Sequence, residues 1–288
     1  MNPAKKILSF FILFLLSQQI IAQDSIPPVQ QPVVKKKDKT SFTISSNFAS
    51  KLHYYGRTDS LKSTALIPNI HIQFGNGIFL NSSFIFINNR QQSFQYTATV
   101  AGGGYNFGKT KGLAGSIYAD KFFYANNTLV QSSQKGQAGF KLSHLNKVLD
   151  VNLGASTVFS DKSDYFASAG VDHIFIFRKK KSVFVIVPAV TANAGTQNFT
   201  HSYYKTRSVF GIPAGEEQVT ETSKRFQLLS YELSVPVAYV YKKLILSFTP
   251  GYVIPQSVIK VAGRPDLSEN ASNLFYANLG VAFKFSTK

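Results

Sequence analysis

Five histidines are the residues of this chain most able to do chemistry: His53, His71, His144, His173 and His201. A serine hydrolase needs a histidine beside its nucleophile and a third group that orients the histidine. His201 is followed directly by Ser202, but neighbouring residues of an extended segment point in opposite directions. We therefore expect no catalytic residue and a non-enzymatic protein. The alternative of a barrel-embedded lipid hydrolase rests on this pair.

The sequence also predicts no metal site and no cofactor. The chain has no cysteine, and no two histidines have the spacing of zinc ligands. The run Gly102-Gly103-Gly104 lacks the following helix that a phosphate loop needs to receive an anion. Glycines inside a strand more often mark a bend or a side chain that packs over them.

The N-terminus has the layout of a secretory signal peptide. Lys5 and Lys6 precede an apolar run over 7–16, and a small-residue site ends at Ala22. The run is shorter than the roughly 20 residues that a membrane-spanning helix requires. We expect residues 1–22 to be cleaved, so that the chain is exported. No cysteine follows the run, which excludes a lipid-modified anchor.

The mature chain is strongly basic, and its location decides what that charge means. Removal of the two signal lysines takes the formal charge from +17 to +15. Export argues against nucleic acid as a partner and favours an anionic membrane surface. An exported eukaryotic domain of this size would often carry disulfides, so the lack of cysteine favours a bacterial envelope.

Residues 23–39 have almost nothing to bury. They hold Pro27, Pro28, Pro32 and three consecutive lysines, a composition typical of an extended, solvated linker. We interpret the segment as a periplasmic linker. An alternative function is a docking or assembly module that binds a periplasmic protein through 24–39.

Residues 40–288 alternate between apolar and polar positions, and after the signal no run of 18 apolar residues occurs. Without a helical span, a chain that crosses a membrane must close its backbone hydrogen bonds in a barrel. The prediction is all-β, a closed antiparallel up-and-down transmembrane β-barrel of about twelve strands. The expected strands are 40–50, 65–74, 78–88, 93–107, 113–125, 137–145, 148–160, 165–178, 182–200, 225–241, 244–256 and 272–285.

The connections between these strands fall into two alternating classes. The tight ones are 75–77, 108–112, 146–147, 179–181 and 242–243. The longer ones are 51–64, 89–92, 126–136, 161–164, 201–224 and 257–271. Outer-membrane barrels have short periplasmic turns and longer external loops. The pattern therefore predicts short turns and both termini on the periplasmic side.

A soluble β-sandwich or a lipocalin-like barrel would alternate in the same way, with its apolar face turned inward. Aromatic residues near strand ends favour the membrane barrel, because such barrels carry interfacial aromatic girdles. These residues are Tyr124, Tyr165, Tyr239, Tyr241, Phe283 and Phe285. Strands 78–88 and 182–190 fit less well, because both of their faces are apolar.

The last strand, 274–285, resembles the assembly signal of Gram-negative outer-membrane β-barrel proteins. In that family the final strand alternates and ends on an aromatic residue that the barrel-insertion machinery reads. Here Phe283 and Phe285 match that pattern, with three further residues after Phe285. The resemblance implies location in the cell outer membrane, with outer-membrane lipid and the barrel-insertion machinery as partners.

Charged residues in the strands are expected to face the lumen, because a lysine at mid-membrane on the lipid face costs about 2–4 kcal/mol. The candidate lumen charges are Lys141, Asp150, Asp172, Glu232 and Lys284. We expect Lys141 to pair with Asp150 across their hairpin. Such charges either hold the interior together or line a pore, and their mixed signs favour neither anions nor cations.

The tight turns hold the excess positive charge. The predicted periplasmic rim consists of Lys109, Lys111, Lys147, Arg178, Lys179, Lys180, Lys181, Lys242 and Lys243. Such a rim could contact anionic head groups, or it could serve only turn solubility. The function expected from the sequence is a narrow pore for small solutes or a structural envelope protein.

Overall fold

The computed structural model describes residues 40–58, 62–108, 112–125, 134–160, 163–196, 200–209, 212–222, 226–257 and 272–287, with backbone alone for 200–209 and 212–222. The predicted signal peptide and linker lie outside these residues. Within the described part of the chain every regular element is a strand. No helix there is long and apolar enough to cross a membrane.

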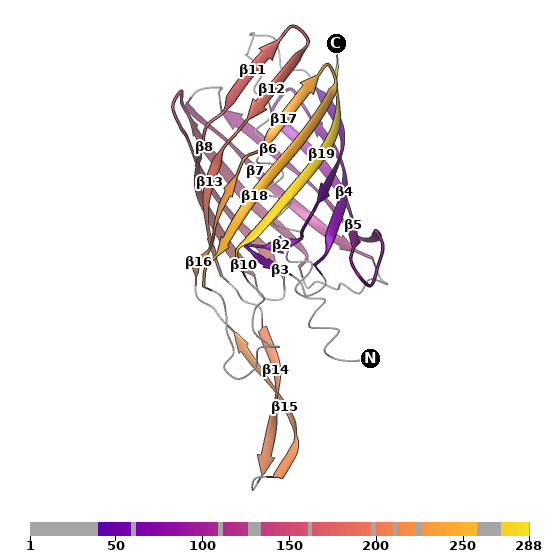
Figure 1. The fold of residues 1–288 in the computed structure, drawn as a ribbon, viewed down its shortest axis with the longest axis vertical. Coiled ribbons are helices and arrows are strands. Elements are labelled where there is room, and N and C mark those ends of the chain that lie inside the picture. Colours follow the sequence, from indigo (N-terminus) through magenta and orange to yellow (C-terminus); the bar gives the residue numbers. More distant parts are fainter. Residues whose placement is uncertain are drawn as a thin grey trace.

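Twelve long antiparallel strands form a closed barrel (Figure 1). The unbroken ones are β1 (Ser41–Ala49), β4 (Thr64–Gln73), β5 (Ile78–Asn88), β6 (Gln95–Gly108), β7 (Gly112–Tyr124), β8 (Gly136–Leu145), β9 (Asp150–Phe159), β18 (Leu244–Pro255) and β19 (Leu274–Ser286). The ring closes because β19 pairs with β1 on one edge and with β18 on the other. The predicted fold class is confirmed, and each expected strand has a counterpart.

Three further strands of the barrel are each interrupted once. They are β10 (Asp164–Asp172) with β11 (Phe175–Lys179), β12 (Ser182–Ile186) with β13 (Ala189–Gly195), and β16 (Gln227–Ser234) with β17 (Val237–Tyr241). Pro188 and Pro236 stand at two of the breaks, where a proline cannot donate to the ladder. The Val187 N–H still donates to the Pro236 carbonyl at 2.8 Å. The breaks therefore align across neighbouring strands and bend the wall without opening it.

Short and long connections alternate except after β9, where the connection predicted to be long, 160–163, is only as long as the 146–149 turn. The turns at 75–77, 146–149, 180–181 and 242–243 leave the same rim as the start of β1 and the end of β19, because Ser41 pairs with Ser286. We call this the turn rim and the opposite end the loop rim. The C-terminus lies at the turn rim in Figure 1.

Two hairpins outside the barrel sheet interrupt the long connections. The first, β2 (His53–Tyr54) with β3 (Arg57–Thr58), lies between β1 and β4. The second, β14 (Thr200–Val209) with β15 (Ile212–Thr222), occupies most of the long connection predicted over 201–224. Its strands pair only with each other. Such a hairpin needs no core-facing stripe, so alternation did not reveal it.

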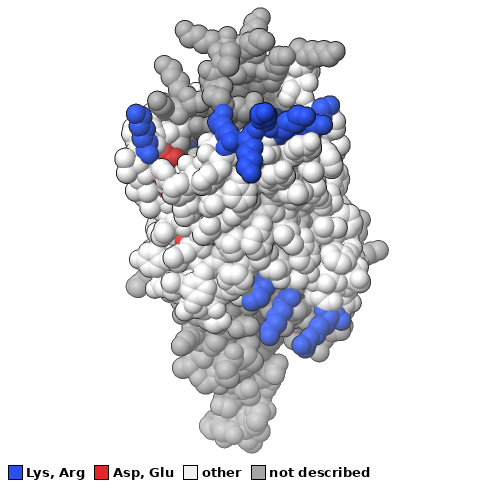
Figure 2. Space-filling model, turned by 45° about the horizontal axis from the view of Figure 1, so that its top comes forward, with Lys and Arg blue, Asp and Glu red and all other residues white. Residues whose placement is uncertain are grey.

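The outer wall of the barrel is apolar. Phe140, Leu153, Tyr231, Leu279 and Phe283 are among many large apolar side chains that are 36–59 % exposed along the strands. Water would disfavour this much exposed apolar surface, whereas hydrocarbon would not. On the face drawn in Figure 2, blue Lys and Arg side chains gather toward the two ends, and a largely white band separates them.

Two details of the predicted faces need correction. Tyr124 does not join an outer girdle, because it packs against the buried cluster inside the barrel. The strands that are apolar on both faces do belong to the barrel: Ile85 and Ile87 of β5 and Val185 of β12 are buried inside. The lumen is thus not polar throughout, and its apolar regions account for the second apolar face.

Candidate functional site: a lumen narrowed by an inner hairpin

The inner wall carries polar side chains that form hydrogen bonds across neighbouring strands at several heights. Asn69 Nδ2 donates to Ser83 Oγ at 2.8 Å, joining β4 to β5. The Ser143 hydroxyl lies 2.6 Å from Asn152 Oδ1, joining β8 to β9. Asn193 Nδ2 donates to Ser230 Oγ at 3.3 Å, joining β13 to β16. These bonds satisfy polar groups inside the wall without a bulky side chain.

Small residues on this inner face make room for larger neighbours. A Cβ on Gly104 would collide with the Phe79 ring, and one on Gly251 would collide with the Tyr276 ring. The expectation that the strand glycines at 102–104 serve packing rather than phosphate binding is confirmed at Gly104.

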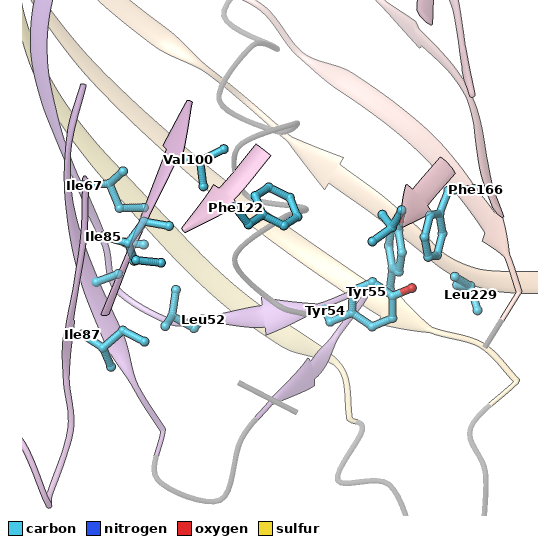
Figure 3. Close-up of a cluster of buried hydrophobic side chains, with 14 residues drawn as sticks. Leu52, Tyr54, Tyr55, Ile67, Ile85, Ile87, Val100, Phe122, Phe166 and Leu229 are labelled. Carbon is cyan, nitrogen blue, oxygen red and sulfur yellow. The ribbon is translucent and has the colours of Figure 1, made fainter. Parts of the chain in front are cut away.

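Toward the loop rim, the β2–β3 hairpin fills part of the lumen. We call residues 52–58 the inner hairpin. Leu52, Tyr54 and Tyr55 are buried in the same cluster as wall residues (Figure 3). The rings of Tyr54 and Tyr55 both lie 6.0 Å from the ring of Phe166, measured between centroids. The remaining wall residues of this cluster are Ala49, Ala65, Ile67, Ile85, Ile87, Ala98, Val100, Phe122, Val158 and Leu229.

Arg57 ties the inner hairpin to the wall at β16 and the end of β18. Its side chain is fully buried, and Nη2 donates to the Gln256 carbonyl at 2.9 Å and to the Ser257 carbonyl at 3.3 Å. Nη1 donates to the carbonyl of Leu229 at 3.4 Å. Because these acceptors belong to β16 or follow β18, which are neighbouring strands, the guanidinium fixes the hairpin to this part of the wall.

His53 of the inner hairpin lies against the barrel wall. Its ring centroid is 4.7 Å from that of Tyr276, and the Tyr276 hydroxyl donates to the Glu232 carboxylate. Burial lowers the pKa of His53 from 6.5 to about 4, and the nearby Lys51 charge adds to that effect. His53 is therefore neutral at neutral pH and serves as a packed ring.

The five predicted lumen charges all lie on the inner face of the wall. Each of them stands next to an outward, exposed apolar residue of its own strand segment, such as Phe140, Val151, Val171, Tyr231 or Phe283. The structure brings together only one pair of them, Asp150 and Asp172, which are directly opposite on β9 and β10. Glu232 lies on β16, and Lys284 lies near the end of β19.

The expected pairing of Lys141 with Asp150 is wrong. The register places Lys141 opposite Gly154, and its Nζ lies 5.9 Å from the centroid of the Tyr118 ring. Asp150 instead accepts from the backbone N–H of Asn146 at 2.7 Å, which closes the β8–β9 turn. The tight turn begins at Asn146 and ends at Leu149, so the two side chains are out of register.

The predicted basic rim is found on the turn rim as far as the structure describes it. Its exposed members are Lys147, Arg178, Lys179, Lys180, Lys181, Lys242 and Lys243, while Lys109 and Lys111 lie outside the described residues. Lys243 Nζ is 5.0 Å from the Phe285 ring centroid, and Phe283 and Phe285 both face outward. At the end of β19, outward-facing phenylalanine rings therefore lie beside the ammonium group of a turn lysine.

The backbone alone places the candidate catalytic pair. His201 and Ser202 lie on β14, opposite Glu221 and Thr220, and their side chains are outside the description. No group of three or more His, Cys, Asp or Glu that could hold a metal occurs among the described residues. The inner hairpin was missed from the sequence, although its Leu-His-Tyr-Tyr run is unusually apolar for an exposed loop.

Comparisons with known proteins bear on the fold alone. No family model and no curated protein matches the chain. Among solved structures, the KdgM porin matches with a TM-score of 0.46 and 10 % identity, over 85 % of this chain and 99 % of that one. An outer-membrane channel from Pseudomonas putida F1 matches with a TM-score of 0.48 and 11 % identity, over 90 % and 100 %.

LpxR from Salmonella typhimurium matches with a TM-score of 0.43 and 10 % identity, over 84 % of this chain and 99 % of that one. The chain is similar in architecture to outer-membrane β-barrel proteins and is itself a closed, twelve-stranded antiparallel barrel.

Proposed function

We propose that this chain is an integral protein of the bacterial outer membrane that forms a narrow, non-enzymatic pore for small solutes. One observation carries the proposal: the wall is a closed ladder with large apolar side chains outside and hydrogen-bonded polar side chains inside. Only a closed barrel can cross lipid with strands, and a polar inner wall suits water and solutes.

The inner hairpin makes the pore narrow. Leu52, Tyr54 and Tyr55 pack against the wall near the loop rim, so a solute would pass beside them rather than through an open cylinder. The same packing supports the second candidate, a structural envelope protein whose barrel is sealed. In both cases the short turns would face the periplasm, as in outer-membrane barrels.

Two measurements test the proposal in order. The protein should fractionate with the outer membrane and migrate faster on a gel when unboiled than when boiled. Folded protein inserted into planar bilayers should then give stepwise conductance. Stable insertion without any current would leave the structural role, and a protein soluble without detergent would refute the membrane barrel itself.

A further inference from the structure

Lys121 of β7 points away from the lumen, in contrast to the expectation for charged strand residues. Its two chain neighbours face inward: Phe122 belongs to the buried cluster, and Asp120 accepts from Gln137 Nε2 at 2.9 Å on the inner wall. Because side chains alternate along a strand, Lys121 lies on the outer wall, where its side chain is exposed. A lysine on the lipid side of a barrel is unfavourable unless it lies near an interface.

The position of Lys121 along β7 places it near the loop rim. The strand ends three residues later, at Tyr124, which is about 10 Å along an extended chain and about 7 Å in height for a strand tilted by about 45°. Outward aromatic rings lie at this level: Phe123 is 47 % exposed, and Phe159, at the end of β9, is 46 % exposed. Such rings mark the interface between hydrocarbon and head groups. The Lys121 ammonium group therefore reaches the head groups of the leaflet at the loop rim.

No acidic side chain of the described barrel strands shares the outer face with Lys121, because their carboxylates all lie on the inner wall. The Lys121 Nζ atom lies 5.4 Å from the centroid of the Phe123 ring, and a ring face attracts a cation without neutralising it. The residues paired with Lys121 on the adjacent strands are Ala101 and Gly136, and Gly136 pairs in turn with Phe159. Neither Ala101 nor Gly136 is long enough to cover the ammonium group. The positive charge is therefore open to a ligand from the membrane.

Hydroxyl groups and further rings lie on the same outer face. Thr99 of β6 pairs with Phe123, and its hydroxyl lies 2.7 Å from the Tyr96 hydroxyl. The Tyr96 ring is 38 % exposed and lies 5.7 Å from the Phe86 ring, measured between centroids. Lysine binds a phosphate as a point charge, and hydroxyls donate to and accept from sugar hydroxyls. An exposed tyrosine offers an apolar face and a polar tip to a ligand that is itself amphipathic.

We propose that an outer patch formed by Lys121, Phe123, Phe159, Tyr96 and Thr99 binds a phosphorylated glycolipid, the kind of lipid that makes up the outer leaflet of a Gram-negative outer membrane. The inference rests on the proposed location of the barrel in that membrane, with the loop rim outside. The ammonium group would contact a phosphate, and the hydroxyls and rings would contact the sugar that carries it. The basic turn rim faces the opposite leaflet in this orientation, so the two surfaces take different lipids.

The test is native mass spectrometry of the folded barrel in mild detergent. The barrel is offered lipid A with both of its phosphates and, separately, lipid A from which the phosphates have been removed. The unaltered protein should bind the phosphorylated form preferentially. Lys121→Met keeps an unbranched side chain without the charge and should bind phosphorylated lipid A about fivefold more weakly, the loss expected for one lysine near an anionic surface. Lys121→Arg should keep the preference.

Lys62→Met is the matched control, because Lys62 is an exposed loop residue outside the patch, and it should bind like the unaltered protein. Each variant is first checked for the faster migration of the unboiled barrel, and Lys121→Gln serves if Lys121→Met does not fold. Undiminished binding by the folded Lys121 variant, or equal binding of the two lipid A forms by the unaltered protein, would overturn the inference.

A further arm adds phosphatidylglycerol in an amount equal to that of lipid A. Lipid A should stay bound, and its displacement would refute the choice of a glycolipid over a phospholipid. These results leave the pore proposal standing, because conductance is measured separately. A protein soluble without detergent would instead refute the membrane barrel and the patch with it.

Discussion

At the scale of single residues, His53 links the inner hairpin to the wall through uncharged packing. Its ring contacts Tyr276, which is bonded to Glu232, and Lys51 lies close enough to disfavour a second positive charge. Buried, neutral histidine is a source of pH dependence, because the unfolded chain takes up a proton more readily than the folded one.

The pKa of His53 falls from 6.5 to about 4 on burial, so the sign of its effect is fixed. The free energy of unfolding is not reduced by His53 above pH 6.5, and it decreases as the pH falls from 6.5 toward 4, because the unfolded chain then binds a proton that the folded chain does not. The full effect is on the order of 3 kcal/mol. We expect His53→Phe, which keeps a ring against Tyr276, to remove this part of the pH dependence.

The measurement is the temperature at which the fast-migrating form of the protein is lost on heating. It is made at neutral pH and at about pH 5, where His53 already lowers the stability of the folded protein. His144→Phe, at an exposed position on β8, is the control and should behave like the unaltered protein. Equal acid sensitivity in His53→Phe and the unaltered protein would contradict the assignment.

At the scale of elements, the inner hairpin is separable from the wall that holds it. Its strands β2 and β3 pair only with each other, so the barrel ladder does not depend on it. Replacing residues 52–62 with a short Gly-Ser turn should leave a folded barrel whose single-channel conductance is larger than that of the unaltered protein.

A milder change tests the same point through Arg57. Arg57→Met removes the donor that holds the carbonyls of Leu229 and Gln256, and each buried carbonyl left unpaired costs about 1–3 kcal/mol. We expect a less heat-stable barrel with noisier conductance. Arg90→Met, at an exposed loop position, is the control. If the variant with residues 52–62 replaced by a Gly-Ser turn has the same single-channel conductance as the unaltered protein, the inner hairpin does not limit the passage of ions.

The barrel strands could be predicted from the sequence, but the inner hairpin could not. Strand positions repeat every second residue and are bounded by turn residues, so the alternation of Leu233, Val235 and Val237 is visible locally. The hairpin depends on contacts such as Arg57 with Gln256, which are 199 positions apart. The alternation of apolar and polar residues along a strand carries no information about a contact of that kind. The one sign of a partly filled lumen in the sequence is that β5 and β12 are apolar on both faces.

At the scale of the whole molecule, charged and apolar side chains occupy different parts of the barrel surface. The outer wall is apolar, and on the face drawn in Figure 2 Lys and Arg side chains gather toward both ends of the barrel. The turn rim carries exposed Lys and Arg, and the acids of the described barrel strands lie on the inner wall. A sequence shows that charge is in excess but not where the closed sheet gathers it. The turn rim collects its charge because every second connection returns to the same end of the barrel.

A basic turn rim should hold anionic phospholipid. Each lysine near an anionic lipid surface contributes about 1 kcal/mol to the free energy of binding. Lys179, at the end of β11, and the turn residues Lys180 and Lys181 are three such exposed lysines in one hairpin. We expect the triple change of these residues to serine to reduce the phosphatidylglycerol that remains bound to barrels extracted in mild detergent from mixed bilayers, measured by native mass spectrometry. The loss should shrink in high salt.

The paired control is Lys62→Ser with Arg90→Ser, which removes exposed charge from the loop rim instead. It should retain more phosphatidylglycerol than the triple variant, because the turn rim holds several more basic residues around the altered hairpin. These include Lys147, Lys242 and Lys243, two of which also lie over the rings of Tyr241 and Phe285. If triple variant and unaltered barrel retain the same lipid, the rim serves only the solubility of its turns.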